Sequence, residues 1–402
     1  MQPRPLPPPG PGIRRRRQAG SASRGVNLPP KWKGVFGGLA VGGGLLLCTC
    51  HGSGSSGAAG GVEPPTASCT PTPTSSLVVN VKDAHYGAKG DGTTDDTAAL
   101  QKAIDAVGGT GGTVSVPAGT YRVNALSSLL LRSGMTLSLD SGAVLAAIPN
   151  GADNYTILRV SGVSNVNILG GTLLGERSAH TGTTGEQGMG LRITGGAQHI
   201  AVVGVTAREC WGDGFTVTDA SDVTLCHVTA DHNRRQGLSI TGGNGVVVRD
   251  SRFVNTGGTL PEDGLDIEPN SGQTVNNVLI TGCVFTNNAG DGIEVGVPIA
   301  YSGLAFIYNV VIDGNTMSGN GAGSLSSGPR SGLEASNTGG HVVKNNTVQS
   351  NVGYGIYLRN GVAGTTVTRN TVTSNGRNGI LEYLSSGNSI TDNTLSGNGV
   401  PP

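Results

Sequence analysis

The stretch Gly264-Leu265-Asp266-Ile267 decides the fold, because the same pattern precedes it at Gly237-Leu238-Ser239-Ile240 and follows it at Gly292-Ile293-Glu294-Val295. In each stretch a Gly is followed by two apolar residues that flank a variable one, an alternation typical of a β-strand. Related stretches begin at eight glycines: Gly190, Gly214, Gly237, Gly264, Gly292, Gly332, Gly355 and Gly379. The steps between them are 24, 23, 27, 28, 40, 23 and 24 residues, so the chain contains an internal repeat.

The length of this repeat indicates how each unit folds. One unit can hold three short strands and three turns, and successive units then stack at the strand spacing of about 4.8 Å. A repeated helical hairpin would be longer and would show apolar residues at a 3.6-residue period. The composition agrees, since 69 of 402 residues are Gly, whereas aromatic residues make up 4% and charged residues 13%. These observations predict an all-β protein, a single-stranded parallel β-helix or solenoid.

Two columns of asparagines support this register. The first column consists of Asn315, Asn346, Asn370 and Asn393. The second follows each of these by five residues and consists of Asn320, Asn351, Asn375 and Asn398. Side chains stacked in this way can donate hydrogen bonds from coil to coil, so we expect both columns to be structural.

The same register predicts the state of three cysteines. It places Cys226, Ser251 and Cys283 in the first asparagine column, so the two thiols would lie two coils, or about 10 Å, apart. This distance exceeds what a disulfide can bridge, and we expect both to be small interior thiols. Cys210 lies in a predicted turn, where no partner is evident.

The first 76 residues differ from the rest of the chain. Residues 1–50 contain a basic leader and a short apolar segment, Val35 to Leu47, which together predict an export signal. Leu45-Leu46-Leu47-Cys48 is similar to a lipoprotein cleavage site, although Leu47 replaces the usual small residue. Residues 51–76 predict a flexible linker, and residues 77–402 the β-helix. We therefore expect a periplasmic, outer-membrane-associated or extracellular protein. A lipid anchor to the membrane is one alternative.

The distribution of charge argues against a nucleic-acid partner. Eight basic residues precede Gly34, and no acidic residue occurs before Glu63. The remaining chain holds 18 basic and 26 acidic residues, whereas a nucleic-acid-binding domain usually carries the opposite excess.

The start of the predicted β-helix carries a resemblance to a known family. A strand is expected around Val78, a helix over Thr97 to Val107 and a strand over Thr113 to Val116. The matching segments are Tyr86 to Gly92, Thr94 to Thr97, Gln101, Ala103 to Asp105 and Val116 to Tyr121. They resemble the pectate lyase superfamily, which includes polygalacturonases, alginate epimerases and phage tailspikes. The resemblance implies a right-handed β-helix whose first coil is capped by the helix, and a polysaccharide substrate.

The variable residue of each repeat should point away from the core and form a shallow strip across the coils. Five acidic residues crowd two neighbouring coils of this strip: Asp263, Asp266, Glu268, Asp291 and Glu294. Like charges on adjacent strands repel, so we expect protonation, neighbouring cations or a metal to relieve the cluster. Ca²⁺ bound by Asp263, Asp266, Glu268 and Asp291 is one possibility. Asp before Gly is also a common turn residue.

Further candidates lie on either side of these acids. The preceding coils supply Asp213, His232, Arg234 and Arg235 as catalytic candidates, with Arg208 and Trp211 as substrate-binding candidates. Further substrate-binding candidates are Glu294 of the acidic group and, on the following coils, Glu334, Tyr354, Tyr357 and Tyr383. The tyrosines can stack on sugar rings or on one another. We expect the long stretch between Gly292 and Gly332, and the segment Glu176 to Gln187, to wall the strip.

Three functions remain open from the sequence. In the first, a lyase or C5-epimerase acts on an acidic polysaccharide, with His232, Arg234 or Arg235 handling the proton and the uronate charge. In the second, a glycoside hydrolase uses two acids from Asp213, Asp263, Asp266 and Asp291. In the third, the protein only binds glycan. No organic cofactor is indicated, and the oligomeric state is open.

The catalytic motifs of the superfamily do not carry over. Asp213 matches the first acid of the polygalacturonase Asn-Thr-Asp motif. One coil later, however, Arg235-Gln236 stands where those enzymes have two acids, and their later Gly-His-Gly and Arg-Ile-Lys motifs have no counterpart. The Asp-Pro-His-Glu motif of alginate epimerases and the Arg-x-Pro-x-x-Arg motif of pectate lyases are also missing.

Overall fold

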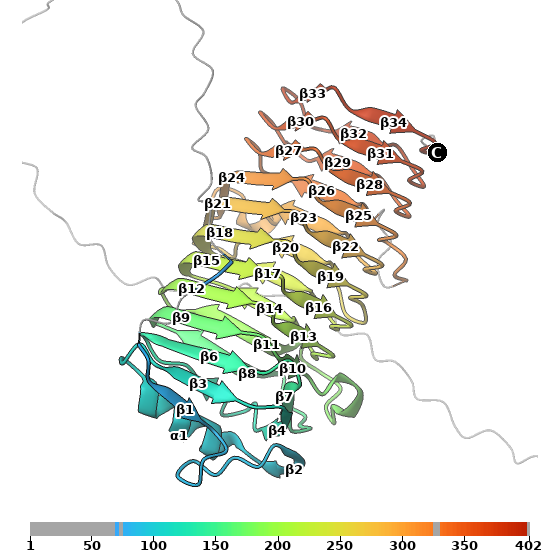
Figure 1. The fold of residues 1–402 in the computed structure, drawn as a ribbon. Helices are drawn as coiled ribbons and strands as arrows, with labels where there is room; N and C mark the ends of the chain where they lie inside the picture. Colours follow the sequence, from blue (N-terminus) through green and yellow to red (C-terminus); the bar gives the residue numbers. More distant parts are fainter. Residues whose placement is uncertain (1–68, 72–74, 325–329, 400–402) are drawn as a thin grey trace, which may run out of the picture. The chain divides into compact units, whose positions relative to one another are not determined.

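The structure is a computed structural model that describes residues 69–71, 75–324 and 330–399. The expected leader and export signal, and most of the expected linker, lie outside the described residues. Within them the chain winds through three parallel sheets, A, B and C (Figure 1). Each coil contributes one strand to sheet A and one to sheet B, and every coil except the first and the last also contributes one to sheet C. The prediction of an all-β fold with stacked parallel strands is confirmed. The described part of the chain contains no helix long and apolar enough to cross a membrane.

The strands follow one another in chain order from coil to coil. Sheet A consists of β1 (Val78–Asn80), β3 (Thr113–Val116), β6 (Met135–Leu139), β9 (Ser164–Leu169), β12 (Ala197–Val203), β15 (Ala220–Cys226), β18 (Gly243–Arg249), β21 (Thr274–Thr281), β24 (Phe306–Asp313), β27 (Val342–Lys344), β30 (Thr366–Thr368) and β33 (Ser389–Thr391). Sheet B consists of β2 (Asp91–Asp95), β4 (Gly119–Val123), β7 (Ala143–Ala147), β10 (Thr172–Leu174), β13 (Thr206–Arg208), β16 (Thr229–Asp231), β19 (Arg252–Val254), β22 (Val284–Thr286), β25 (Thr316–Ser318), β28 (Thr347–Gln349), β31 (Thr371–Thr373) and β34 (Thr394–Ser396). Sheet C consists of β5 (Leu129–Leu130), β8 (Asn154–Ser161), β11 (Gln187–Thr194), β14 (Phe215–Val217), β17 (Leu238–Ile240), β20 (Leu265–Ile267), β23 (Ile293–Gly296), β26 (Leu333–Ser336), β29 (Ile356–Arg359) and β32 (Ile380–Tyr383).

The single α-helix of the described residues, α1 (Thr97–Val107), has the predicted bounds. Its apolar side, with Leu100, Ile104 and Val107, is buried and belongs to the same hydrophobic core as the first coils. Two short 3₁₀ helices, η1 (Arg177–Ala179) and η2 (Ile299–Tyr301), lie in the two long connections. That α1 caps the solenoid stays a prediction.

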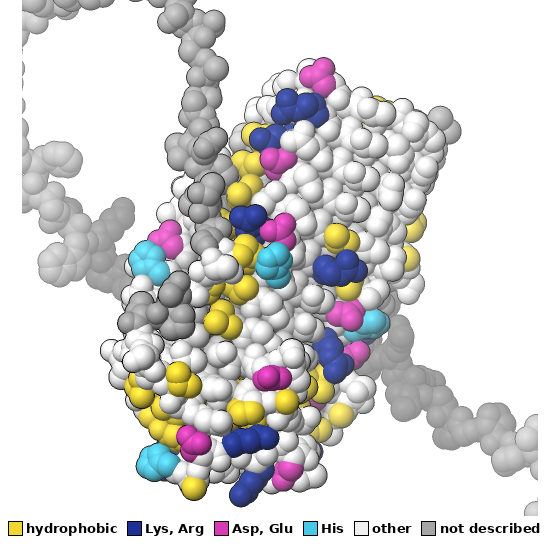
Figure 2. All heavy atoms as spheres, in the orientation of Figure 1, with side chains coloured by type: hydrophobic (Ala, Val, Ile, Leu, Met, Phe, Trp, Pro, Cys, Tyr) yellow, Lys and Arg dark blue, Asp and Glu magenta, His cyan; other side chains and the backbone are white. Residues whose placement is uncertain are grey.

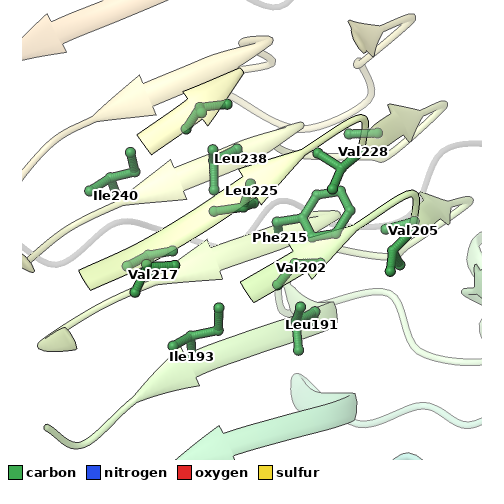
Figure 3. Close-up of a cluster of buried hydrophobic side chains, with 14 of the residues drawn as sticks. Leu191, Ile193, Val202, Val205, Phe215, Val217, Leu225, Val228, Leu238 and Ile240 are labelled. Carbon is green, nitrogen blue, oxygen red and sulfur yellow. The ribbon is translucent and has the colours of Figure 1, made fainter. Parts of the chain in front are cut away.

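The repeats build the core as their alternation predicts. Phe215, Leu238, Leu265 and Ile293 are direct neighbours on β14, β17, β20 and β23, and all are buried. Figure 3 shows such side chains from successive coils pointing into the interior. The repeat glycine is required by close stacking: a Cβ added at Gly237 would lie 2.3 Å from the carbonyl oxygen of Gly264. Glycine at this position therefore allows neighbouring coils to stack without a side chain between their backbones.

Both asparagine columns are present, and their members are buried except Asn393 and Asn398 in the last coil, which are half-buried. In the second column the main-chain N–H and the side-chain Nδ2 of Asn320 donate to Oδ1 of Asn351, at 3.0 and 2.9 Å. Asn351 donates in the same way to Asn375 and also to the carbonyl oxygen of Met317. The column begins earlier than predicted, since Asn288 donates to Asn320. Each amide thus satisfies buried polar groups of two coils.

We expect Asn351→Ala to lower the free energy of unfolding by roughly 2–4 kcal/mol, because two buried donors of Asn320 lose their acceptor. The midpoint of urea unfolding measures this loss. Asn244→Ala is the matched control, since Asn244 is exposed and accepts one surface hydrogen bond, from Asn277. Equal midpoints for the two variants would contradict the structural role of the column.

The prediction for Cys226 is wrong. Cys226 pairs with Arg249 in the ladder of sheet A, and Val228, not Cys226, lies in line with Ser251 and the first asparagine column. Alternation along β15 then turns Cys226 away from the core, where it forms a disulfide with Cys69. Cys69, expected within a flexible linker, is therefore attached to the β-helix. Cys283 and Cys210 are buried free thiols, as predicted.

Candidate functional site

An outward-facing column of side chains crosses sheet C in the predicted register. Its members on successive strands are Arg159, Arg192, Thr216, Ser239, Asp266, Glu294, Glu334 and Tyr357. The column is basic at one end and acidic in its middle. The expectation of a shallow exposed strip is wrong for the acidic part, because only 2% of Asp266 and 4% of Glu334 remain exposed.

Three carboxyl groups meet at the centre of this column. One oxygen each of Asp263, Asp291 and Glu294 lie within 4.8 Å of one another. Oδ1 of Asp263 accepts the main-chain N–H of Asp291 at 2.5 Å and lies 3.6 Å from Nη1 of Arg330. Oδ2 of Asp263 is buried with no hydrogen-bond partner among the described residues. The predicted clustering of acids is thus confirmed, with Glu294 as its half-buried member.

Burial raises the pKa of every acid in this region. It is the main cause for Asp263 and Asp266, and the neighbouring Glu294 carboxyl raises the pKa of both further. Burial likewise raises the pKa of Glu294, reinforced by Glu334 and opposed by Arg359 and Arg330. The same holds for Asp291, where the second cause is Asp263. Part of the cluster is therefore protonated under conditions in which exposed carboxyl groups are ionised.

Asp266 and Glu268 lie beside the three-carboxyl group. Oδ2 of Asp266 accepts from Nε2 of Gln236 at 2.7 Å, and its Oδ1 is buried without a partner in the described chain. Glu268 is half-buried, and its pKa is raised by burial and Glu294 but lowered by Arg235. Neither residue contributes to the group of carboxyl oxygens that lie within 4.8 Å of one another. Of the four predicted Ca²⁺ ligands, that group therefore contains Asp263 and Asp291.

Asp213 and Arg235 form an ion pair on the basic side of the acids. Nη1 of Arg235 lies 3.2 Å from Oδ1 of Asp213, and the Ser239 hydroxyl donates to the same carboxylate at 2.8 Å. Burial raises the pKa of Asp213, and Arg235 opposes this shift. Arg235 also acts on Asp266 and Glu268 through its charge. It is therefore the predicted cation that the structure places nearest the acids.

Trp211 has both ring faces covered. The His180 ring stacks on it at 3.9 Å and the Arg234 guanidinium lies over it at 3.8 Å. Two groups this close cannot share one side, so they occupy opposite faces. Nε1 of Trp211 donates to the carbonyl oxygen of Gly185, as does Arg234. In this arrangement Trp211 has no free face for a sugar ring.

The remaining basic candidates lie apart from the acids. The exposed His232 interacts through Nδ1 with Oδ1 of Asp231 at 2.6 Å. Arg208 is exposed at the end of β13 in sheet B, where it lines a depression of about 350 Å³ together with Glu176. The predicted grouping of a His and several arginines around the acids therefore holds for Arg235 alone.

Two of the three predicted tyrosines pack against each other and leave little ring surface for a sugar. Tyr354 and Tyr357 are each 8% exposed, and their rings lie 4.5 Å apart. Of the three predicted substrate-binding tyrosines, Tyr383 is 52% exposed. Glu334 is held by Arg359, whose Nε donates to it at 2.5 Å.

Both expected walls contact side chains that lie beside the column. Glu186, from the segment before β11, lies 3.7 Å from Nε of Arg235. Arg330 and Ser331, which end the long stretch before β26, contact Asp263 and Asp291. Three site residues were not predicted from the sequence: Arg330, Arg359 and Arg159. Arg159 could have been found from Leu158-Arg159-Val160, which repeats the alternation of its neighbour without the preceding Gly.

A surface depression of about 750 Å³ lies away from this column, at the starts of β12, β15, β18 and β21 in sheet A. Apart from Asp219, its polar lining is uncharged, with residues such as Gln198, Ser221 and Asn244. Figure 2 shows a face on which charged side chains occur singly or in small groups among uncharged surface. The dense charge of the sheet C column therefore distinguishes it chemically from this depression.

Known proteins resemble the chain in sequence and in fold. A family model described as rhamnogalacturonase A/epimerase, pectate lyase-like, matches residues 78–307, and one described as a right-handed β-helix region matches residues 276–400. Mannuronan C5-epimerase AlgE4 of Azotobacter vinelandii is 35% identical over 151 residues, which are 34% of this chain and 27% of that protein. Exo-poly-alpha-D-galacturonosidase of Dickeya chrysanthemi is 51% identical over 76 residues, 19% of this chain and 12% of that protein. The matches thus span a minor part of these relatives.

The solved structure of the AlgE4 A-module superposes with a TM-score of 0.59 at 23% identity, over 80% of this chain and 97% of that chain. This similarity shows the fold. Because the first family model covers more than half of the chain, the protein belongs to the pectate lyase-like family described as rhamnogalacturonase A/epimerase.

Proposed function

We propose that the protein is a carbohydrate-active enzyme that hydrolyses an acidic polysaccharide with the carboxyl groups of β20 and β23. The convergence of Asp263, Asp291 and Glu294 within 4.8 Å is the observation that carries this proposal. Glycoside hydrolysis needs one protonated carboxyl group and one carboxylate near the same bond. A crowded, buried set of acids supplies both, because repulsion keeps some members protonated while neighbouring arginines favour ionisation of others.

Accessibility selects the members that can touch a sugar. Asp263 is fully buried and Asp291 is 2% exposed, whereas Glu294 and Glu268 are half-buried. Gly296 lies beside Glu268 in the register of sheet C, where an added Cβ would lie 2.6 Å from Oγ of Ser336. Burial raises the pKa of both groups. We assign Glu294 as the proton donor, since burial and Glu334 both disfavour its ionisation, and Glu268 as the carboxylate, since Arg235 opposes the rise in its pKa. Asp263, Asp266 and Asp291 then position and tune these two groups.

Arg234 and His232 take no part in this proposal, because their contacts lie with Trp211 and Asp231. Arg235 is the one of the three basic candidates that lies near the acids, and Asp213 holds it in an ion pair. We therefore prefer hydrolysis to the lyase or epimerase reaction.

C5-epimerisation or β-elimination is the second candidate, favoured by the fit of the same acids to Ca²⁺. Oxygen ligands of Ca²⁺ lie 2.3–2.6 Å from the ion, so opposite ligands are separated by about 5 Å. Asp263, Asp291 and Glu294 satisfy this spacing, and the unpartnered Oδ2 of Asp263 adds an available ligand atom. Bound Ca²⁺ would neutralise a uronate carboxylate. In the hydrolase, by contrast, Ca²⁺ would occupy Glu294 and inhibit the reaction.

We expect Asp263→Asn to gain stability over the unaltered protein as the pH rises. The raised pKa of Asp263 means that the folded state holds a proton that the unfolded state loses above about pH 4. The stability associated with that proton is full at low pH and falls as the pH rises through the folded-state pKa. Melting temperatures from pH 4 to 9 measure the difference between the two proteins. A constant difference, as expected for the exposed Asp392→Asn control, would contradict the buried acid cluster.

A panel of uronate polysaccharides tests the proposed function. The full chain is incubated with polygalacturonate, rhamnogalacturonan and alginate, with Ca²⁺ or with chelator, and reducing ends, unsaturated products and uronate composition are scored separately. New reducing ends without unsaturation, inhibited by Ca²⁺, are expected. Unsaturated products, or altered uronate composition, that depend on Ca²⁺ would replace hydrolysis by the second candidate. Binding without any of these changes would leave a glycan-binding protein.

A further inference from the structure

Two arginines on neighbouring strands lie at the basic end of the sheet C column. Arg159 on β8 pairs directly with Arg192 on β11, so their side chains leave the same face one strand spacing, or about 4.8 Å, apart. Like charges directly opposite one another in a sheet are destabilising. Such a pair therefore calls for a compensating anion.

The described residues supply no direct counterion for this pair. Neither guanidinium forms a hydrogen bond or an ion pair there, and the Nε atom of each is buried without a partner. Asp213 influences Arg192 through its charge, but its carboxylate is engaged by Arg235, Ser239 and Thr216. Burial lowers the pKa of Arg192, and the neighbouring Arg159 lowers it further. Both arginines are half-buried, so an anion from solvent can reach the part of each group that remains exposed.

The pair also stands in line with the acids. Thr216 and Ser239 separate Arg192 from Asp266 in the column, which places Arg192 about 14 Å and Arg159 about 19 Å from Asp266 at ordinary strand spacing. A sugar chain lying along sheet C would span both. Guanidinium groups bind carboxylates through paired, charge-assisted hydrogen bonds. Two adjacent guanidinium groups together offer more N–H donors than one carboxylate can accept.

We propose that Arg159 and Arg192 form a binding subsite for the carboxylate of a uronate residue, several sugars away from the reacting bond. The subsite selects acidic over neutral polysaccharide and fixes the register of the chain on the column. The position of the subsite relative to the reacting bond rests on the proposed function. Binding of a uronate carboxylate by the two arginines does not depend on turnover.

Binding of oligogalacturonate and of its methyl-esterified form tests the subsite. Calorimetry on the full chain is expected to show tighter binding of the acidic form, and Arg159→Gln and Arg192→Gln are each expected to weaken that binding about tenfold, as loss of a charge-assisted hydrogen bond does. Binding of the ester should be unchanged. The double Lys variant should recover part of the affinity, and Arg252→Gln, on the outer face of sheet B, should behave like the unaltered protein. Melting temperatures establish that each variant folds.

The outcomes separate this inference from the proposed function. If the acidic form binds through the arginines but is not cleaved, the subsite stands and the hydrolase proposal fails. If the polysaccharide is cleaved with KM and Kd unchanged in both Gln variants, the subsite is wrong and the hydrolase proposal stands. Equal affinity of the unaltered protein for the acidic and esterified forms, or no binding of either, would overturn the subsite.

Discussion

Glu294→Gln is expected to lower kcat/KM on the cleaved polysaccharide by about 10²–10⁴-fold, the usual contribution of a general acid. The amide has nearly the same shape but cannot transfer the proton. Folding should not suffer, because the substitution removes one of several repelling acids around Asp263 and Glu334. Initial rates of reducing-end release, with melting temperatures for both proteins, measure the effect.

Two companion variants sharpen this result. Asp266→Asn changes the group that adjoins Glu294 in the register, so we expect it to shift the pH profile of kcat/KM as well as to reduce activity. Asp392→Asn, an exposed change in the last coil, should leave the rate unaltered. Full activity in Glu294→Gln would remove Glu294 from the chemistry.

Replacing both Cys69 and Cys226 by Ser is expected to lower the free energy of unfolding by about 5 kcal/mol, which is the loop-entropy value for a cross-link between residues 157 apart in sequence. The reason is that the disulfide limits the freedom of the unfolded chain. The midpoint of urea unfolding measures the loss. The activity on polysaccharide should persist under native conditions, because Cys226 ends a strand of sheet A and the acids lie on sheet C.

Reduction by dithiothreitol provides the control for this prediction. It should destabilise the unaltered protein to the level of the double variant and should not affect the variant itself. Cys283→Ser removes a buried free thiol but keeps the disulfide, so reductant should destabilise this variant as much as it destabilises the unaltered protein. Equal stability of the oxidised and reduced proteins would show that the disulfide contributes nothing.

The sequence predicts the fold well because the fold repeats. Each Gly repeat specifies one strand of sheet C, and each column asparagine must find an equivalent asparagine one coil away, so the register is determined many times over. Asn320 and Asn351 could therefore be aligned from spacing alone. Cys226 could not be aligned in this way, because the coil that contains it has no asparagine in the first column. Alignment to Ser251 of the next coil placed Cys226 where Val228 lies, two residues out of register.

The candidate site is only partly predictable for a different reason. Alternation correctly turns Asp266 and Glu294 away from the core. The alternation does not predict which residues cover these two side chains. Arg330 contacts the cluster from a long connection, and the path of that connection is not determined by any repeat. The same limit applies to Trp211, since the ring faces occupied by His180 and Arg234 depend on the segment before β11.

The central claim is that the acids of β20 and β23 cleave a glycosidic bond with water. Mass spectrometry of the products formed from an acidic polysaccharide in heavy-oxygen water tests it most directly. The account predicts that each new reducing end carries one heavy oxygen and that no product is unsaturated. Products without the label, whether unsaturated or epimerised, would contradict it and would assign the acids to proton abstraction at C5.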